Sequence, residues 1–259
     1  MITPLSGKDK NIIDEYLTRK PLFAQFWIDI IQEYGYENGF LTIYSCSDKG
    51  NITGLFAILL NNLMIYSDRD TMPAKEILNY LEDNKIPFSI VKGEESLVKN
   101  FENYVDFTTK YGTHMCLLNK KDYIPVSYAD IIIEQAMDRD VDDIIAFFNR
   151  ISEFRRFMND EAVRLFINYG HTYMAIDKGK IVALVICNST NRKMATISSI
   201  ATLPESRNKG YATKLLSYIC NSLLKISQSC SVCYDKSASS SIYTAVGFKE
   251  IGKQAIYIK

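Results

Sequence analysis

Two cations and a glycine stand where a strand-like run, residues 195–203, gives way to a helical one. The residues read Arg207-Asn208-Lys209-Gly210-Tyr211-Ala212. The first backbone N–H groups of a helix have no partner inside it, and the macrodipole gives that end a partial positive charge. Gly210 lets a bulky anion approach the backbone, and the two cations add charge. The pattern predicts a pyrophosphate site, with a plain solvated helix cap as the alternative.

A tyrosine that can transfer a proton follows, one helix and one strand further along the chain. Tyr243 lies in "SIYTAVGF", residues 241–248, where a short helix is expected to end at Gly247-Phe248. A phenol can donate a proton to a departing thiolate. The alternative is simple core packing, because the chain contains 17 tyrosines.

The helix that begins at the first motif is well marked by its apolar spacing. Its apolar residues recur on one face, at Ala212, Leu215, Leu216, Ile219, Leu223 and Leu224. This periodicity is typical of an amphipathic helix that packs on a core. The motif therefore lies in the turn between a strand and the first turn of this helix.

Together the two motifs resemble those of the GNAT superfamily of N-acetyltransferases, over residues 131–259. The first is similar to the family's Arg-x-x-Gly-x-Ala motif after a strand ending in Thr-x-Pro, here Thr202-Leu203-Pro204. The second is similar to the family's tyrosine helix followed by Gly-Phe. The chain departs from the family at 235–239, where Asp-Lys-Ser-Ala-Ser replaces a frequent Asn-Pro pair, and Ser237 or Ser239 is expected to cap the helix.

The resemblance implies acetyl-CoA as co-substrate and a role for each matching position. Backbone groups of Ile200 and Thr202 would bond the pantetheine arm, the amides of 207–212 would cradle the pyrophosphate, and Tyr243 would stand near the thioester sulfur. The expected cofactor-binding residues are Ile200, Ala201, Thr202, Arg207, Asn208, Lys209, Gly210, Tyr211, Ala212, Thr213 and Ser239. No metal is expected.

The general base is less sharply indicated. Glu153 and Glu161 flank the run "EFRRFMNDE", where the family builds its acceptor pocket, and Arg155 and Arg156 stand beside Glu153. We take Glu153 as the candidate base. A solvated charged helix face is an equally good reading, and many family members use water instead.

The chain is expected to contain the same α/β layout twice. It reads "DKGNITGL" at 48–55 and "DKGKIVAL" at 177–184, each between two strand-like runs, which predicts two hairpins. In both halves, helical segments precede the hairpin, and strand, helix, strand, helix and strand follow it. We expect two tandem GNAT-like domains, residues 1–124 and 125–259, each a mixed, mostly antiparallel sheet flanked by helices.

The first half lacks the anion motif. At the position equivalent to "RNKGYA" the chain reads "DRDTMPAK", residues 68–75, with no glycine. Asp68 and Asp70 would repel a pyrophosphate at the start of the helix. We expect a degenerate copy that keeps the layout and binds no CoA.

Composition bounds the rest. In 259 residues, 30 Lys and Arg balance 30 Asp and Glu, which argues against nucleic-acid or anionic-membrane partners. Neither a signal peptide nor a membrane span is recognised, so a cytoplasmic protein is expected. Cys230 and Cys233 form one C-x-x-C, and we expect strand cysteines packed as small hydrophobes rather than zinc ligands.

The first expectation for function is a GNAT-type N-acetyltransferase that acts on the amine of a small molecule or peptide. Transfer would be direct, in a ternary complex, by a monomer or homodimer. A module that binds or senses acyl-CoA without turnover is the alternative from another class. A transferase that takes amino acids from charged tRNA is a third reading, against which the neutral charge and the intact pyrophosphate motif speak.

Overall fold

The computed structural model divides into two compact units, described here one at a time. The N-terminal unit comprises Met1–Thr113 and Gly252–Lys259, and the C-terminal unit comprises His114–Ile251. The structure describes all residues except 21–22, 25–26, 29–30, 32–34, 37–40, 60, 153, 155–159, 170, 191 and 236–239. The domain boundary predicted between residues 124 and 125 stays a prediction.

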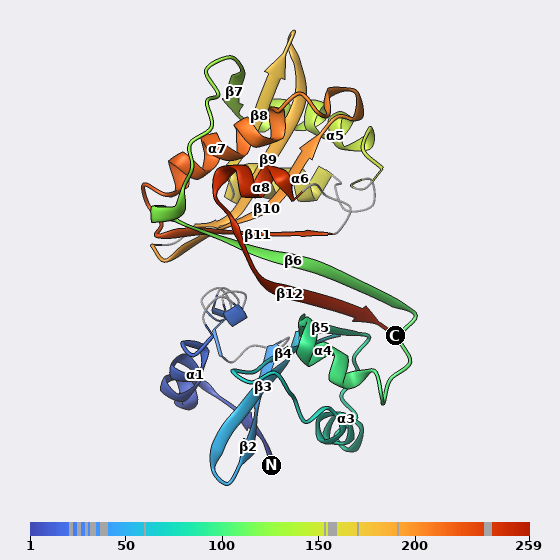
Figure 1. Ribbon diagram of the computed structural model, residues 1–259. Helices are drawn as coiled ribbons and strands as arrows, with labels where there is room; N and C mark the ends of the chain where they lie inside the picture. The colour runs from blue at the N-terminus through green and yellow to red at the C-terminus, as the bar shows by residue number, and fades with distance from the viewer. Residues whose placement is uncertain are drawn as a thin grey trace. The chain divides into compact units, whose positions relative to one another are not determined.

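The N-terminal unit is a mixed sheet with helices on both faces (Figure 1). Its sheet order is β1-β2-β3-β4-β5-β12, with β4 and β5 parallel and the pairs β1–β2, β2–β3, β3–β4 and β5–β12 antiparallel. The strands are β1 (Ile2–Leu5), β2 (Leu41–Asp48), β3 (Asn51–Leu59), β4 (Asn62–Tyr66), β5 (Ile90–Glu94), and residues 252–258 of β12 (Lys249–Ile258). Residues 109–113 of β6 (Thr109–Asn119) also belong to this unit, and the rest of β6 belongs to the C-terminal unit. The helices are η1 (Gly7–Asp9), α1 (Lys10–Leu17), α3 (Ala74–Asp83), α4 (Glu95–Val98) and η2 (Lys99–Phe101).

The C-terminal unit repeats this layout. Its sheet order is β6-β11-β10-β9-β8-β7, with β10 and β11 parallel and β7 to β10 antiparallel. The strands are β7 (Ile132–Gln135), β8 (His171–Asp177), β9 (Lys180–Thr190), β10 (Met194–Thr202) and β11 (Ser229–Asp235). The helices are η3 (Lys120–Asp122), η4 (Asp138–Asp140), α5 (Val141–Asn149), α6 (Asp160–Tyr169), η5 (Pro204–Ser206), α7 (Tyr211–Leu223) and α8 (Ser241–Val246).

Both predicted hairpins form, and their turns explain the repeated Asp-Lys-Gly. Lys49 and Gly50 have φ of 48° and 83°, and Lys178 and Gly179 have 50° and 73°. Two consecutive left-handed residues are the requirement of a type I′ turn, which matches the twist of the flanking strands. The hairpins and the shared strand order confirm the predicted mixed α/β layout in two copies.

Alternating residues of β9 separate the two layers of the C-terminal unit. Ala183, Val185 and Cys187 face the cluster that contains the buried side of α7, and Leu184 and Ile186 face the cluster built by α5 and α6. Figure 1 shows the same arrangement, with α7 and α8 on one face of the strands and α5 and α6 on the other. The predicted apolar face of α7 is buried from Leu215 to Leu224, whereas Ala212 is half-buried.

The last strand divides between the units, which the sequence did not indicate. Gln254–Ile258 of β12 pair antiparallel with Ile90–Glu94 of β5, inside the N-terminal unit. The C-terminal run was expected to complete the second half alone. A strand pattern shows that a segment is extended and half-buried, but it carries no information about which edge the segment joins.

Candidate functional site

The parallel strands β10 and β11 are paired over only part of their length. Their register runs from Met194 opposite Ser229 to Ile197 opposite Val232. Beyond it, β10 continues to Thr202 and β11 to Asp235. On its other edge β10 stays paired with β9, after a bulge that leaves Ser198 as the extra residue. The strands therefore open toward their carboxyl ends, and the β11-facing backbone edge of 198–202 borders that opening.

The predicted anion motif lies where β10 leads into α7. Asn208 and Gly210 both adopt left-handed backbone conformations, with φ of 63° and 81°. Gly210 is the N-cap of α7, and no side chain of a described residue caps the helix there. Residues 207–210 are exposed. The first amides of α7 are thus presented to solvent at the positive end of a thirteen-residue helix, next to two cations.

Three contacts fix this loop and the first turn of α7. The guanidinium Nε of Arg207 donates to the carbonyl of Thr202 at 3.3 Å, which folds the loop back on its strand. The hydroxyl of Tyr211 donates to Asp177 at 3.0 Å, and this hydrogen bond raises the pKa of Tyr211. The ammonium of Lys214 pairs with Asp130 at 2.5 Å and lowers the pKa of that carboxyl.

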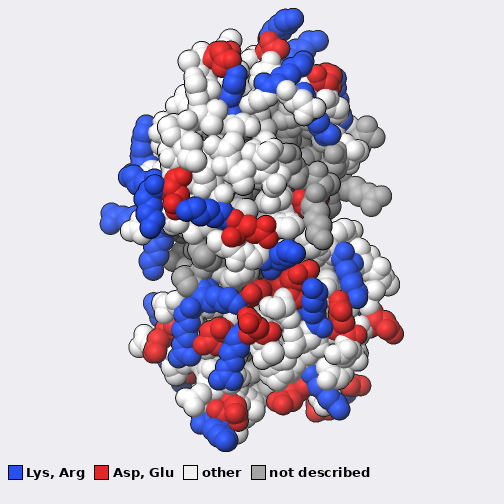
Figure 2. Space-filling view, in the orientation of Figure 1, with Lys and Arg blue, Asp and Glu red and all other residues white. Residues whose placement is uncertain are grey.

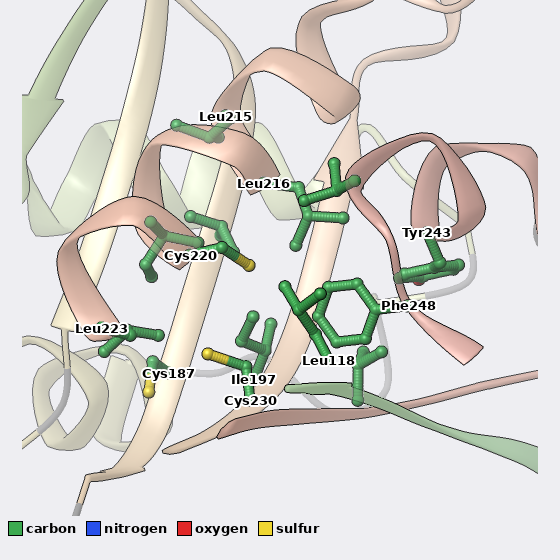
Figure 3. Packing of buried hydrophobic residues seen from close by; sticks show 14 of the residues in the cluster. Leu118, Cys187, Ile197, Leu215, Leu216, Cys220, Leu223, Cys230, Tyr243 and Phe248 are labelled. Carbon is green, nitrogen blue, oxygen red and sulfur yellow. The ribbon is translucent and has the colours of Figure 1, made fainter. Parts of the chain in front are cut away.

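Tyr243 stands on α8, at the edge of the C-terminal core. Its ring is 5% exposed, stacks on Tyr234 at 4.7 Å between centroids, and meets Phe248 edge-on at 6.1 Å. Figure 3 shows it beside Phe248, at the margin of the cluster that includes Leu118 and Ile197. Burial is the largest cause that raises the pKa of this phenol, and the neighbouring ionisable groups of Cys116, Tyr234, Asp235 and Cys233 act in the same direction. The hydroxyl therefore keeps its proton through the neutral range.

The glycine after this helix has two physical reasons. Gly247 is the C-cap of α8 with φ of 101°, a conformation that favours glycine. A Cβ built there would lie 2.1 Å from the carbonyl oxygen of Asp122. The Gly-Phe pair thus lets the chain pass close to η3 and brings Phe248 into the core beneath Tyr243.

The structure brings most of the predicted cofactor-binding residues into one continuous stretch. Ile200, Ala201 and Thr202 form the end of β10, and the remaining predicted residues from Arg207 to Thr213 form the loop and the start of α7. Ala201 is 4% exposed and packs toward α5 and α6, so its backbone is the part that borders the opening. Glu153 and Ser239 lie outside the described residues, as do Arg155, Arg156 and Ser237. The side chain of Glu161 is likewise not described.

The C-x-x-C pair is split between two environments. Cys230 is fully buried in the core cluster, as expected, but Cys233 is exposed, so the prediction that both pack as core residues was wrong. Positions three apart on a strand point to opposite faces, which separates the two thiols. Within the described part of the chain, no group of three or more His, Cys, Asp or Glu is arranged to hold a metal ion.

The equivalent loop of the N-terminal unit is filled by internal contacts. The carboxylate of Asp68 accepts hydrogen bonds from the Tyr16 hydroxyl at 2.7 Å and from Arg19 at 3.3 Å. Burial tends to raise the pKa of Asp68, but these two donors outweigh it and the pKa is lowered. Pro73 is the N-cap of α3, and Glu76 stands in its first turn. On the face that Figure 2 shows, basic and acidic side chains are interspersed over this unit.

The strand opening is also narrower in the N-terminal unit. The register of β4 and β5 ends at Met64 opposite Lys92. The next residues are still in close contact, because a Cβ on Gly93 would lie 2.7 Å from the carbonyl oxygen of Ile65. Glu94 then pairs with Lys20 at 2.5 Å. This unit keeps the strand order of the C-terminal unit without its open strand ends.

Comparison with known families agrees with this arrangement. Residues 168–250 match the family model of the acetyltransferase (GNAT) domain. The matched stretch contains β8 to β11, the loop before α7 and the tyrosine helix α8. Over these residues the C-terminal unit is therefore similar to GNAT acetyltransferase domains, as the two motifs predicted.

Solved structures share the fold of the whole chain at low sequence identity. A GCN5-related N-acetyltransferase from Sphaerobacter thermophilus has a TM-score of 0.66 at 12% identity, covering 100% of this chain and 95% of the other. A GNAT-family acetyltransferase from Colwellia psychrerythraea has a TM-score of 0.60 at 11% identity, with all of both chains covered. A tandem GNAT protein from the clavulanic acid biosynthesis pathway has a TM-score of 0.59 at 10% identity, covering 100% and 98%.

These similarities show the fold, which is that of tandem GNAT proteins. A search of curated proteins finds no match to the sequence. Among the helices of the described residues, none has the length and apolar character required to cross a membrane.

Proposed function

We propose that the chain is an N-acyltransferase that moves an acetyl group from acetyl-CoA to the amine of a small molecule or a peptide. The observation that carries the proposal is the opening between β10 and β11. Along β10 it leads to the uncapped start of α7, and along β11 it ends at Cys233 and Asp235, two ionisable groups that help to raise the pKa of Tyr243. The loop before α7, the end of β10 beyond its register with β11, and Tyr243 would then serve as anion cradle, pantetheine-binding edge and proton donor around one space.

The loop residues would hold the pyrophosphate. The amides of Tyr211, Ala212 and Thr213 stand in the first turn of α7, and the left-handed conformations of Asn208 and Gly210 turn the preceding backbone outward. Backbone donors at a helix start bind phosphate groups without any specific side chain. Arg207 and Lys209 would add attraction that weakens with salt.

The end of β10, beyond its register with β11, would hold the pantetheine arm and the thioester oxygen. The strand amides and carbonyls of residues 199–202 would suit the two amides of pantetheine. A bound acyl-CoA supplies the thioester, whose carbonyl carbon forms a bond to the amine nitrogen as its bond to sulfur breaks. A strand N–H aimed at the carbonyl oxygen would stabilise the negative charge that develops there.

Tyr243 would give its proton to the departing sulfur and regain it from solvent. Its raised pKa keeps the phenol protonated at neutral pH, as a general acid requires. The amine loses its proton to water or to a base. Glu153 stays the candidate for that base from the sequence alone.

Removal of the Asp130 carboxylate should strengthen CoA binding. The stem of Lys214 passes near Gly210, since a Cβ there would lie 3.8 Å from its Cε, while its ammonium is held by Asp130. Asp130→Asn frees a cation beside the anion site and removes a negative charge. We expect calorimetric titration to give about 2-fold to 5-fold tighter CoA binding, the size of one helix-terminus charge effect. Asp142→Asn, an exposed change on α5, is the matched control, and equal gains in both variants would contradict this role.

The full chain should bind a single CoA, in the C-terminal unit. In the N-terminal unit, the Tyr16 and Arg19 contacts occupy Asp68, and β4 and β5 stay close at Gly93. Calorimetry is expected to give a stoichiometry of one in the full chain, and no binding in the Gly210→Asp variant at the CoA concentrations that just saturate the wild type. A second saturable site that persists in that variant would show that the N-terminal unit binds CoA.

A thiol-release screen tests the activity. The full chain is incubated with acetyl-CoA and a panel of small amines and peptides, and free CoA thiol is followed with and without each amine. Amine-dependent release that Gly210→Asp abolishes is the expected result. Tight CoA binding without release for any amine would favour the sensing module, and amine transfer only from aminoacyl-tRNA would favour the third reading.

A further inference from the structure

Tyr234 is stacked against two other rings. Its ring lies 4.7 Å from that of Tyr243 at an interplanar angle of 17°, and 5.2 Å from that of His114 at 14°. The three rings come from three elements, β11, α8 and β6. Stacked aromatic contacts of this kind stabilise a structure beyond the area that they bury. Tyr234 is therefore the link between the sheet and the tyrosine of the proposed site.

The strand order indicates on which side of Tyr234 each ring lies. β11 stands between β6 and β10 in the sheet. His114 comes from β6, so it covers the side of Tyr234 that faces β6. On the other side, pairing with β10 has already ended at Val232. The ring of Tyr243 thus occupies the side where the strands open, and Tyr234 forms the wall against which it rests.

The hydroxyl of Tyr234 holds the same helix at a second point. The side chains of Ser240 and Cys116 lie close enough to this hydroxyl to act on its pKa, which Cys116 raises and Ser240 lowers. Ser240 is the N-cap of α8, and its carbonyl accepts the amides of Tyr243 and Thr244, each at 3.1 Å. Tyr234 therefore contacts both the first turn of α8 and the ring that α8 carries. A six-residue helix has little rigidity of its own, so such contacts determine where its side chains lie.

His114 is held in turn by Glu250. Its Nδ1 lies 2.9 Å from Oε1 of Glu250, a contact that becomes an ion pair when the imidazole is protonated. Within the described residues this nitrogen makes no hydrogen bond, so the contact with Glu250 and the stacking on Tyr234 are what orient the ring. The imidazole is 17% exposed and Glu250 44% exposed, which leaves the far end of the stack near solvent.

We propose that Tyr234, supported by His114, is a positioning residue that sets the place of the Tyr243 hydroxyl at the strand opening. The proposal rests on the proposed function, because positioning matters for rate only if Tyr243 serves as the acid. In this proposal β11 both borders the cofactor and positions the proton donor. A misplacement of about 1 Å in a reacting group can cost as much as 100-fold in rate.

Kinetics of single variants give the first test. Tyr234→Leu removes the stack and the hydroxyl and should lower kcat by about 10-fold to 100-fold, while CoA affinity and the acceptor KM stay within about 2-fold. Tyr234→Phe keeps the ring and should restore most of the rate. His114→Leu, a change at the far end of the stack, should give a smaller loss in the same direction. Tyr218→Leu is the matched control, since Tyr218 is also half-buried and meets two rings, Tyr128 and Tyr173.

A double-variant cycle separates positioning from general damage. In the Tyr243→Phe background the hydroxyl to be positioned is absent, so Tyr234→Leu should cost no more than about 2-fold further in kcat. Equal losses with and without the Tyr243 hydroxyl would overturn the proposal. So would a wild-type kcat in both Tyr234→Leu and His114→Leu.

A third measurement does not depend on turnover. In protein labelled with carbon-13 at the tyrosine ζ position, the Tyr243 signal is identified by its loss in Tyr243→Phe. That signal should shift in Tyr234→Leu and His114→Leu and stay unchanged in Tyr218→Leu. An unshifted signal would refute the positioning role even if no acceptor is found. If the signal shifts but no amine yields thiol release in the wild type, the proposed function fails and the structural link stands.

Discussion

Arg207→Glu should weaken CoA binding by about 2–4 kcal/mol, equal to about 30-fold to 900-fold in Kd. The reason is the place of Arg207 at the uncapped start of α7, where a carboxylate would face the phosphates and would also break the tie to the Thr202 carbonyl. Gly210→Asp should have an effect of similar size, because it sets a charge and a side chain against the same groups. Calorimetric titration with CoA measures both.

Controls separate charge from backbone strain. Lys225→Glu makes the same charge reversal just beyond the other end of α7 and should leave CoA affinity within about 3-fold. Gly210→Ala adds only a methyl group, whose nearest neighbour is 3.8 Å away, so its smaller loss reports the strain of φ at 81°. Gly50 in the N-terminal unit has φ of 83° and open space around it. The variant Gly50→Asp should therefore be less stable, and its affinity for CoA should be unchanged.

The salt dependence provides a further check. A phosphate site built from exposed cations loses affinity as salt rises, and the loss should be shallower in Arg207→Glu than in the wild type. Unchanged CoA affinity in both Arg207→Glu and Gly210→Asp, with circular dichroism showing intact folds, would remove the anion site from this loop.

The features that the sequence predicted best are those set by local physics. The two type I′ turns follow from Asp-Lys-Gly, because Gly50 and Gly179 accept left-handed φ at no cost. The amphipathic run from Leu215 to Leu224 buries the expected face. The position of Gly210 as the N-cap of α7 also follows from the chain alone, since an apolar period and a glycine at its start define a helix boundary.

The features that the sequence did not predict depend on which distant segments meet. Gln254–Ile258 looked like a last strand of the second half, but these residues pair with β5, some 160 residues earlier in the chain. A strand pattern shows which face of the strand is buried, but it does not identify such a distant partner strand. The exposure of Cys233 was not predicted either. This residue follows the last residue of β11 that pairs with β10, and a strand pattern does not show which face of the strand is left uncovered there. The stacking of His114 on Tyr234, and of Tyr234 on Tyr243, joins three elements, and neither His114 nor Tyr234 stands in a motif.

Tyr243→Phe should lower turnover by about 100-fold or more while CoA affinity changes by less than about 1 kcal/mol. In the proposed site the phenol lies beside the opening of β10 and β11, and burial, with the neighbouring Asp235, keeps it protonated. The variant keeps the ring, so the stack on Tyr234 and the contact with Phe248 should survive. A loss in kcat alone is what the removal of a proton donor produces. Tyr218→Phe, a half-buried tyrosine of α7 with its own ring contacts, should keep the wild-type rate.

The pH profile gives the sign of the effect. Because the pKa of Tyr243 is raised, the acid form persists as pH rises through the neutral range and is lost only when pH passes the raised pKa. The wild-type rate should therefore show no fall from this group between pH 7 and the usual tyrosine range, and the ratio of wild-type to variant rates should stay constant there. The measurement uses an amine found in the thiol-release screen, with chemistry shown to be rate-limiting. If Tyr243→Phe then turns over at the wild-type rate across the whole range, Tyr243 is a core aromatic and water is the acid that protonates the thiolate.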